Sequence, residues 1–123
     1  MISVIPCRDK ETINKLFNEC NIETDEYSGC VIASQNDDML GYCLYSLTKD
    51  KMTVFTVEPQ NDILLADGIL RSALHVAAEN FVLDAFYAKS APIELFNTLG
   101  FIKNKDENRL DIDKLFGGCN CHK

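Results

Sequence analysis

The sequence has 123 residues and a mass of 13.8 kDa, a length that fits one domain. Its 19 acidic and 12 basic residues give a formal net charge of -7, which opposes binding to nucleic acids and anionic membranes because both are polyanions. No apolar run approaches the ~20 residues of a membrane span. The N-terminus lacks the basic and apolar pattern of a secretory signal, so we expect a cytoplasmic protein.

The first half of the chain predicts a strand, a helix and a three-stranded meander. Residues 2–5 favour a short strand, and the apolar spacing after Asp9 predicts a helix whose buried face consists of Ile13, Leu16, Phe17 and Cys20. Three runs rich in β-branched and aromatic residues follow, at 30–34, 39–47 and 52–57. The turns between these runs are short and polar, so we expect the three strands to pair antiparallel.

The second half predicts a crossover to a parallel strand. Pro59 ends the third run, and apolar residues at helical spacing then predict a helix from about Asp62 to Asn80. Residues 81–87 predict a buried strand, which is expected to lie parallel to the strand at 52–57 because a helix separates the two. The order is completed by a short helix at 91–99, its stop at Gly100, and two last strands at 101–103 and 110–112.

Three motifs in this order carry a family resemblance. Residues 93–101 read IELFNTLGF, the strand before the long helix ends Val57-x-Pro59, and residues 68–74 read GILRSAL. Together they resemble the GNAT N-acetyltransferase family, in which a helix reading roughly A-I-x-L-Y-E-K-L-G-F runs into the next strand. The resemblance implies an α+β protein with the acyl-CoA N-acyltransferase fold, a central mixed and mostly antiparallel sheet flanked by helices. It implies one GNAT-like domain at 1–116 and a cysteine-rich tail at 117–123.

The resemblance also implies a reaction, the transfer of an acetyl group from acetyl-CoA to the amine of a small molecule or peptide. A homodimer is compatible with it. Glu58 stands at the end of the central strand, where such folds often place the general base, and the backbone of Val57 would polarise the acetyl carbonyl. The family's loop for the CoA diphosphate corresponds here to Ala66, Asp67, Gly68, Ile69 and Leu70. The connector at 21–29 is shorter than is usual in the family, so we expect an open acceptor site.

Several of these positions depart from the family's pattern. The diphosphate loop of the family reads R/Q-x-x-G-x-G/A, whereas this chain has Leu65 at the basic position and adds the carboxylate of Asp67. We expect the helix to begin near Asp62 and to use the loop's backbone donors for its own hydrogen bonds, in which case no cofactor binds there. A helix capped by Asp67 after an open loop is the alternative. Phe96 stands where many members have a proton-donating tyrosine.

These departures support a second hypothesis, a catalytically inactive GNAT-like domain with a binding or regulatory role. The cysteines support a third hypothesis, a metal-binding or thiol-redox role for the tail. Cys7, Cys20, Cys30 and Cys43 lie in apolar segments and are expected to be free, buried thiols. Three further ligands for zinc or another soft metal lie in the tail, at Cys119, Cys121 and His122. A redox disulfide and a flexible terminus are the alternatives for this tail.

Overall fold

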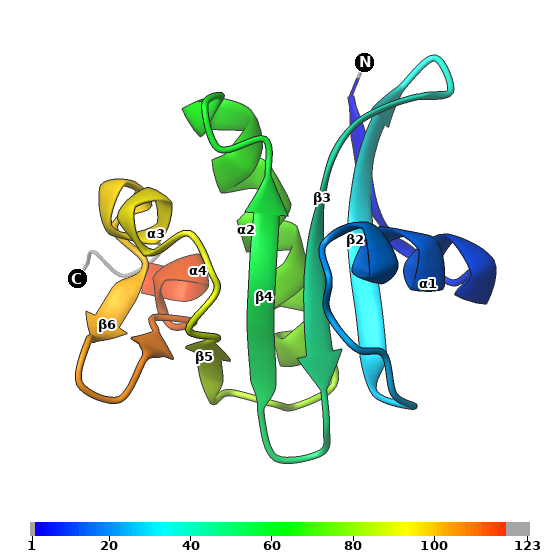
Figure 1. The fold of residues 1–123 in the computed structure, drawn as a ribbon. Helices are drawn as coiled ribbons and strands as arrows, with labels where there is room; N and C mark the ends of the chain where they lie inside the picture. The colour runs from blue at the N-terminus through cyan, green and yellow to red at the C-terminus, as the bar shows by residue number, and fades with distance from the viewer. Residues whose placement is uncertain (1, 118–123) are drawn as a thin grey trace.

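The structure, a computed structural model, describes residues 2–117. Seven strands form one sheet in the order β1-β2-β3-β4-β5-β7-β6 (Figure 1). The strands are β1 Ser3–Cys7, β2 Ser28–Gln35, β3 Asp38–Leu47, β4 Met52–Glu58, β5 Ala85–Tyr87, β6 Ile102–Asn104 and β7 Arg109–Leu110. The helices are α1 Lys10–Glu19, α2 Ile63–Glu79, α3 Ile93–Leu99 and α4 Lys114–Gly117. Among the described residues, no helix has the length and apolar character that crossing a bilayer requires.

The antiparallel meander is confirmed. Strands β1 to β4 pair in chain order, each antiparallel to the one before. The turn between β2 and β3 places Asn36 and Asp37 at φ 52° and 70°, a left-handed backbone that Asn and Asp tolerate better than other side chains. Strand β1 is at the edge of the sheet, which is where a strand can accommodate a proline such as Pro6.

The crossover is also confirmed, but its strand is shorter than expected. Strands β4 and β5 pair parallel, whereas residues 81–84 are not part of β5. Helix α2 ends when Phe81 takes φ 62° and the N–H of Val82 donates to the carbonyl of Ala77 at 2.9 Å. This left-handed stop leaves Phe81 93% exposed. The apolar run at 81–87, which predicted one strand, therefore forms three parts: the end of α2 at Phe81, a buried core residue at Val82, and the short strand β5.

The last third of the chain follows the expected order, with one addition. Helix α3 ends at Gly100, whose φ of 78° is the left-handed stop that the sequence predicted. Strand β7 inserts between β5 and β6. The short helix α4 was not expected, and its Lys114 donates to the carbonyl of Leu99 at 2.7 Å, which satisfies a backbone acceptor at the end of α3.

The helices cover both faces of the sheet and make two separate cores. Helix α2 packs on one face and α1 on the other, and Figure 1 shows α1 in front of the strands and α2 behind them. Alternation along the strands divides the side chains, so that Val31 and Cys43 join the α2 core while Cys30 and Leu44 join the α1 core. Of the four described cysteines, all of them free, Cys30 and Cys43 are buried as predicted, whereas Cys7 and Cys20 are only half-buried.

Candidate active site

Strands β4 and β5 separate partway along β4. Their pairing runs from Met52 to Val54 on β4. The last hydrogen bond between the two segments is donated by the N–H of Ala88 to the carbonyl of Val54, at 2.9 Å. Strand β4 continues to Glu58 and pairs with β3 on its other side. In the described part of the chain, residues 55–58 therefore have a backbone edge that pairs with no strand on the β5 side. Figure 1 shows β4 extending well beyond the short β5.

A bulge lies in this same part of β4. Opposite the consecutive residues Leu44 and Tyr45 of β3 stand Thr56 and Val54, so Phe55 is one extra residue on β4. Bulges bend a strand and turn its backbone groups away from the regular ladder. The bulge and the unpaired edge together make residues 55–58 a stretch of backbone that can donate hydrogen bonds to a ligand.

The carboxylate of Glu58 closes this stretch and is held by two polar neighbours. Its Oε2 accepts a hydrogen bond from Gln60 Nε2 at 2.9 Å and one from Thr56 Oγ1 at 3.4 Å. Tyr42 is its direct cross-strand partner on the α1 face. Burial raises the pKa of the Tyr42 phenol well above its usual range, and the Cys20 side chain and then the charge of Glu58 add to the effect. The raised pKa keeps the phenol of Tyr42 protonated, so that it stands beside Glu58 as a neutral hydroxyl.

The N-terminus of α2 confirms the prediction of an early helix start. Asp62 is the N-cap, and its Oδ1 accepts a hydrogen bond from the N–H of Leu65 at 3.2 Å. Asp67 lies in the second turn, so the alternative in which it caps a later helix is wrong. It is also not a free charge, because Arg71 Nε donates to Asp67 Oδ2 at 2.8 Å. Residues 66–70 are helical, and three of them are buried in the α2 core, namely Ala66, Ile69 and Leu70.

Gly68 provides a test of this helix. A Cβ atom built at Gly68 meets no other atom within 4 Å. We therefore expect Gly68→Ala to raise the free energy of unfolding by about 0.5–1 kcal/mol, because alanine has the better helix propensity. Urea unfolding of the two proteins measures the difference. A clear loss of stability would mean that Gly68 occupies a loop backbone that alanine cannot adopt.

Two aromatic residues lie side by side where the pairing of β5 with β4 ends. Phe96 of α3 is fully buried, and its ring centroid is 5.8 Å from that of Tyr87 on β5. The Tyr87 hydroxyl is buried, and among the described residues it has no hydrogen-bond partner. Because a buried polar group is nearly always paired, this hydroxyl is a candidate for contact with a ligand. The sequence placed Tyr87 in the core, and nothing in the pattern indicated that its hydroxyl lacks a partner.

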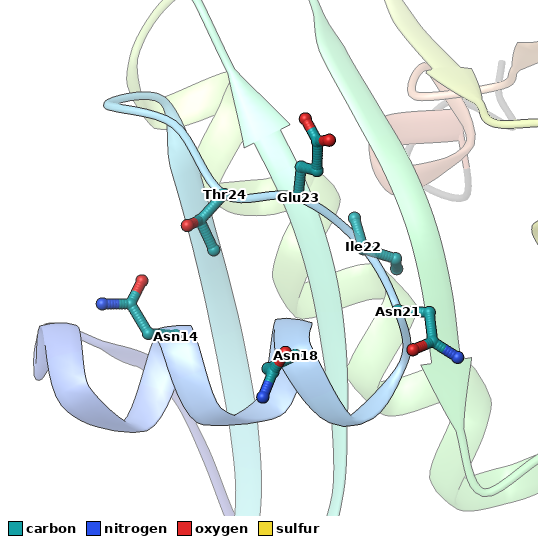
Figure 2. Close-up of a pocket in the computed structure, with 6 residues that line it drawn as sticks. All are labelled: Asn14, Asn18, Asn21, Ile22, Glu23 and Thr24. Carbon is teal, nitrogen blue, oxygen red and sulfur yellow. The ribbon is translucent and has the colours of Figure 1, made fainter.

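A polar cavity of about 430 Å³ lies between α1 and the connector that follows it (Figure 2). Its lining residues are Asn14, Asn18, Asn21, Ile22, Glu23 and Thr24. Ile22 also packs against the α1 core beside Tyr42 and Phe55, so the cavity adjoins the face of β3 and β4 that carries Glu58. The sequence predicted an open region at 21–29. It did not indicate the two asparagines at helical spacing on α1.

The remaining predicted residues divide into two groups. The side chain of Val57 is fully buried in the α2 core, so only its backbone can take part in chemistry. The proposed metal ligands Cys119, Cys121 and His122 lie outside the described residues. Within residues 2–117, no group of three or more His, Cys, Asp or Glu side chains is arranged to hold a metal ion.

Comparison with known proteins identifies the fold. No family model matches the chain, and no curated protein matches it. A protein from Desulfovibrio desulfuricans, described as an acetyltransferase of the GNAT family, matches at a TM-score of 0.57 and 14% identity over 81% of this chain and 83% of that one. A ribosomal-protein-alanine N-acetyltransferase from Brucella melitensis matches at a TM-score of 0.58 and 10% identity, over 80% and 90%.

A third solved structure was determined with coenzyme A bound. This protein, described as the N-acetyltransferase YhhK of E. coli, matches at a TM-score of 0.54 and 13% identity over 85% of this chain and 94% of that one. The three matches agree with the mixed sheet and its flanking helices. The chain therefore has the α+β fold of GNAT N-acetyltransferases, as the resemblance implied.

Proposed function

We propose that this protein is an acyl-CoA-dependent N-acetyltransferase that acts on an amine. The observation that carries the proposal is the unpaired, bulged edge of β4 at residues 55–58, which ends at the carboxylate of Glu58. Acetyl-CoA would supply an acetyl thioester. The backbone N–H groups of this edge, at Val57 in particular, would donate to the acetyl carbonyl, and such oriented donors stabilise negative charge on oxygen.

The polar cavity beside α1 is the proposed acceptor site. An ammonium group is recognised by carbonyl and carboxylate oxygens, which Asn18, Asn21 and Glu23 offer on the cavity wall. Glu58 would accept a proton from the amine before transfer. Cys20 connects the two places, because it directly precedes Asn21 of the cavity wall and its Sγ is 3.6 Å from the hydroxyl of Tyr42, the cross-strand neighbour of Glu58.

The start of α2 fits a diphosphate poorly. Its first turn presents the carboxylate of Asp62, which already takes the Leu65 N–H, and the donors near Gly68 belong to the helix. We therefore propose that the acetyl donor is held through its thioester arm along β4. In consequence, the diphosphate should add little affinity.

The substitution Asp62→Asn tests this arrangement. Asparagine caps helices about as well as aspartate, so the fold is preserved while one negative charge is removed. We expect acetyl-CoA to bind roughly fivefold more tightly, because the repulsion of a nearby phosphate is lost. Acetyl-pantetheine, which has no diphosphate, should bind equally to both proteins. Isothermal titration calorimetry of the two donors measures this, and no binding of either donor at millimolar concentration would refute the transferase proposal.

Tyr87→Phe separates a structural from a catalytic role of the unpaired hydroxyl. Removing a buried hydroxyl without a partner should raise the free energy of unfolding by about 1 kcal/mol. If the Tyr87 hydroxyl supplies the proton that Phe96 cannot give to the departing thiolate, turnover should fall about tenfold or more in the same variant. Urea unfolding and thiol release from acetyl-CoA measure the two effects. A gain in stability without a loss of turnover would assign Tyr87 to the core alone.

A GNAT-fold domain that binds a ligand without transferring an acetyl group is the second candidate. It is favoured by the Asp62-capped start of α2 and by Phe96 at the position of the family's tyrosine. Turnover with a panel of amines decides between the two functions. Binding of the donor without thiol release from any amine would support this second candidate.

A further inference from the structure

Cys7 and Cys30 stand directly opposite each other on neighbouring strands. The antiparallel register of β1 and β2 pairs Cys7 with Cys30, and residues paired in this way have their side chains on the same face of the sheet. The Cα atoms of such pairs are about 4.5–5.5 Å apart. Disulfides need a Cα separation of about 4.4–6.8 Å, so the Cα spacing of this register lies within the range that a disulfide requires.

The two thiols differ in their access to solvent. Cys30 is fully buried in the α1 core, whereas Cys7 is half-buried and lines a cavity of about 400 Å³ together with Arg8 and Tyr27. Burial raises the pKa of Cys30 to about 12, and the adjacent Cys7 thiol contributes to the increase. A reagent from solvent therefore reaches the Cys7 thiol first. The buried Cys30 thiol is the partner that reacts second.

The other described cysteines lack such a partner. Cys43 pairs with Val31 and therefore lies on the α2 face, away from Cys7 and Cys30. Cys20 lies at the end of α1, and its thiol contacts the hydroxyl of Tyr42. Within residues 2–117, the only two cysteines that face each other across a strand pair are Cys7 and Cys30.

We infer that Cys7 and Cys30 form a reversible redox pair that reacts with small-molecule disulfides such as oxidised glutathione. In the first step the Cys7 thiolate attacks one sulfur of the reagent, the reagent's S–S bond breaks, and one thiolate leaves. In the second step the Cys30 thiolate attacks the Cys7 sulfur of the mixed disulfide. The Cys7–Cys30 bond forms, the second reagent thiolate leaves, and the two reagent thiolates take up the two protons that the cysteines lost. The protein is oxidised by two electrons and the reagent is reduced by two.

The bond would act on the part of the chain that lines the polar cavity. It closes a loop over residues 7–30, which contains all of α1 and the connector after it. Closing a loop of this length restricts the unfolded chain, so the oxidised protein should be the more stable form.

Equilibration of the full chain in buffers of increasing oxidised-to-reduced glutathione ratio tests the inference. We expect the intact mass to fall by two hydrogens and Tm to rise by roughly 10 °C, with both changes reversed by dithiothreitol. Cleavage at glutamates and aromatic residues separates the peptides, and a Cys7–Cys30 linked peptide should appear. Cys30→Ser should instead accumulate a glutathione adduct on Cys7, and Cys7→Ser should leave Cys30 reduced.

Cys20→Ser is the matched control, because Cys20 is half-buried next to the same core but has no opposing thiol. It should form the Cys7–Cys30 link at the same glutathione ratio as the unsubstituted protein. Absence of the linked peptide at the most oxidising ratio, or a link that joins Cys7 or Cys30 only to another cysteine, would overturn the inference. Circular dichroism of each reduced variant establishes that the variants are folded.

Discussion

Replacement of Gly41 by alanine is expected to destabilise the protein by about 2–3 kcal/mol. A Cβ atom at this position would collide with the backbone carbonyl of Glu58 and would lie 2.7 Å from Pro59 Cδ and 2.8 Å from Ile69 Cδ1. None of these neighbours can move cheaply. The first is backbone, the second is part of a ring, and Ile69, which belongs to α2, is fully buried against the sheet. Urea unfolding of Gly41→Ala measures the loss.

Gly68→Ala is the matched control for Gly41→Ala, because the same methyl group is added at a position with open space around it. The two variants should change stability in opposite directions. Gly41→Ala should also displace the Glu58–Pro59 turn, so any acetyl-transfer activity should fall together with stability. Equal stability of Gly41→Ala and the unsubstituted protein would show that β3 and this turn do not approach so closely.

Glu58→Gln is expected to lower kcat for acetyl transfer about 100-fold or more, because an amide cannot accept the proton of the amine. The amide oxygen can still accept the hydrogen bond from Gln60, so the local structure should be retained. Affinity for acetyl-CoA should be unchanged, since the role proposed for Glu58 concerns the acceptor. Thiol release with a responsive amine measures kcat, and calorimetry measures donor binding.

The control for Glu58→Gln is Glu94→Gln, a change of the same kind at an exposed glutamate in the first turn of α3. It should leave kcat and donor affinity unaltered. If Glu58→Gln retained full turnover, the general base would have to be another group. A parallel fall in donor affinity would instead indicate that Glu58 supports the donor site.

The order of the elements could be predicted from the sequence because it depends on local patterns. The meander followed from alternating apolar residues with short polar turns, and α2 followed from a helical repeat that starts at Asp62. The motif at residues 93–101 indicated the GNAT-like fold, which the solved structures support. The strand expected at 81–87 is shorter in the structure because the left-handed backbone at Phe81 ends α2 inside this run. Where α2 ends depends on its packing against the sheet, which the local sequence pattern does not specify.

Composition, periodicity and motif spacing thus determined the fold class and the position of α2, since each depends on neighbours in the chain. The tertiary structure decided which side chains meet across the sheet. The pairing of Cys7 with Cys30, the missing partner of the Tyr87 hydroxyl and the contact of Gly41 with the Glu58 turn join residues that are distant in sequence. Such contacts follow from strand register and helix packing, which local preference does not specify.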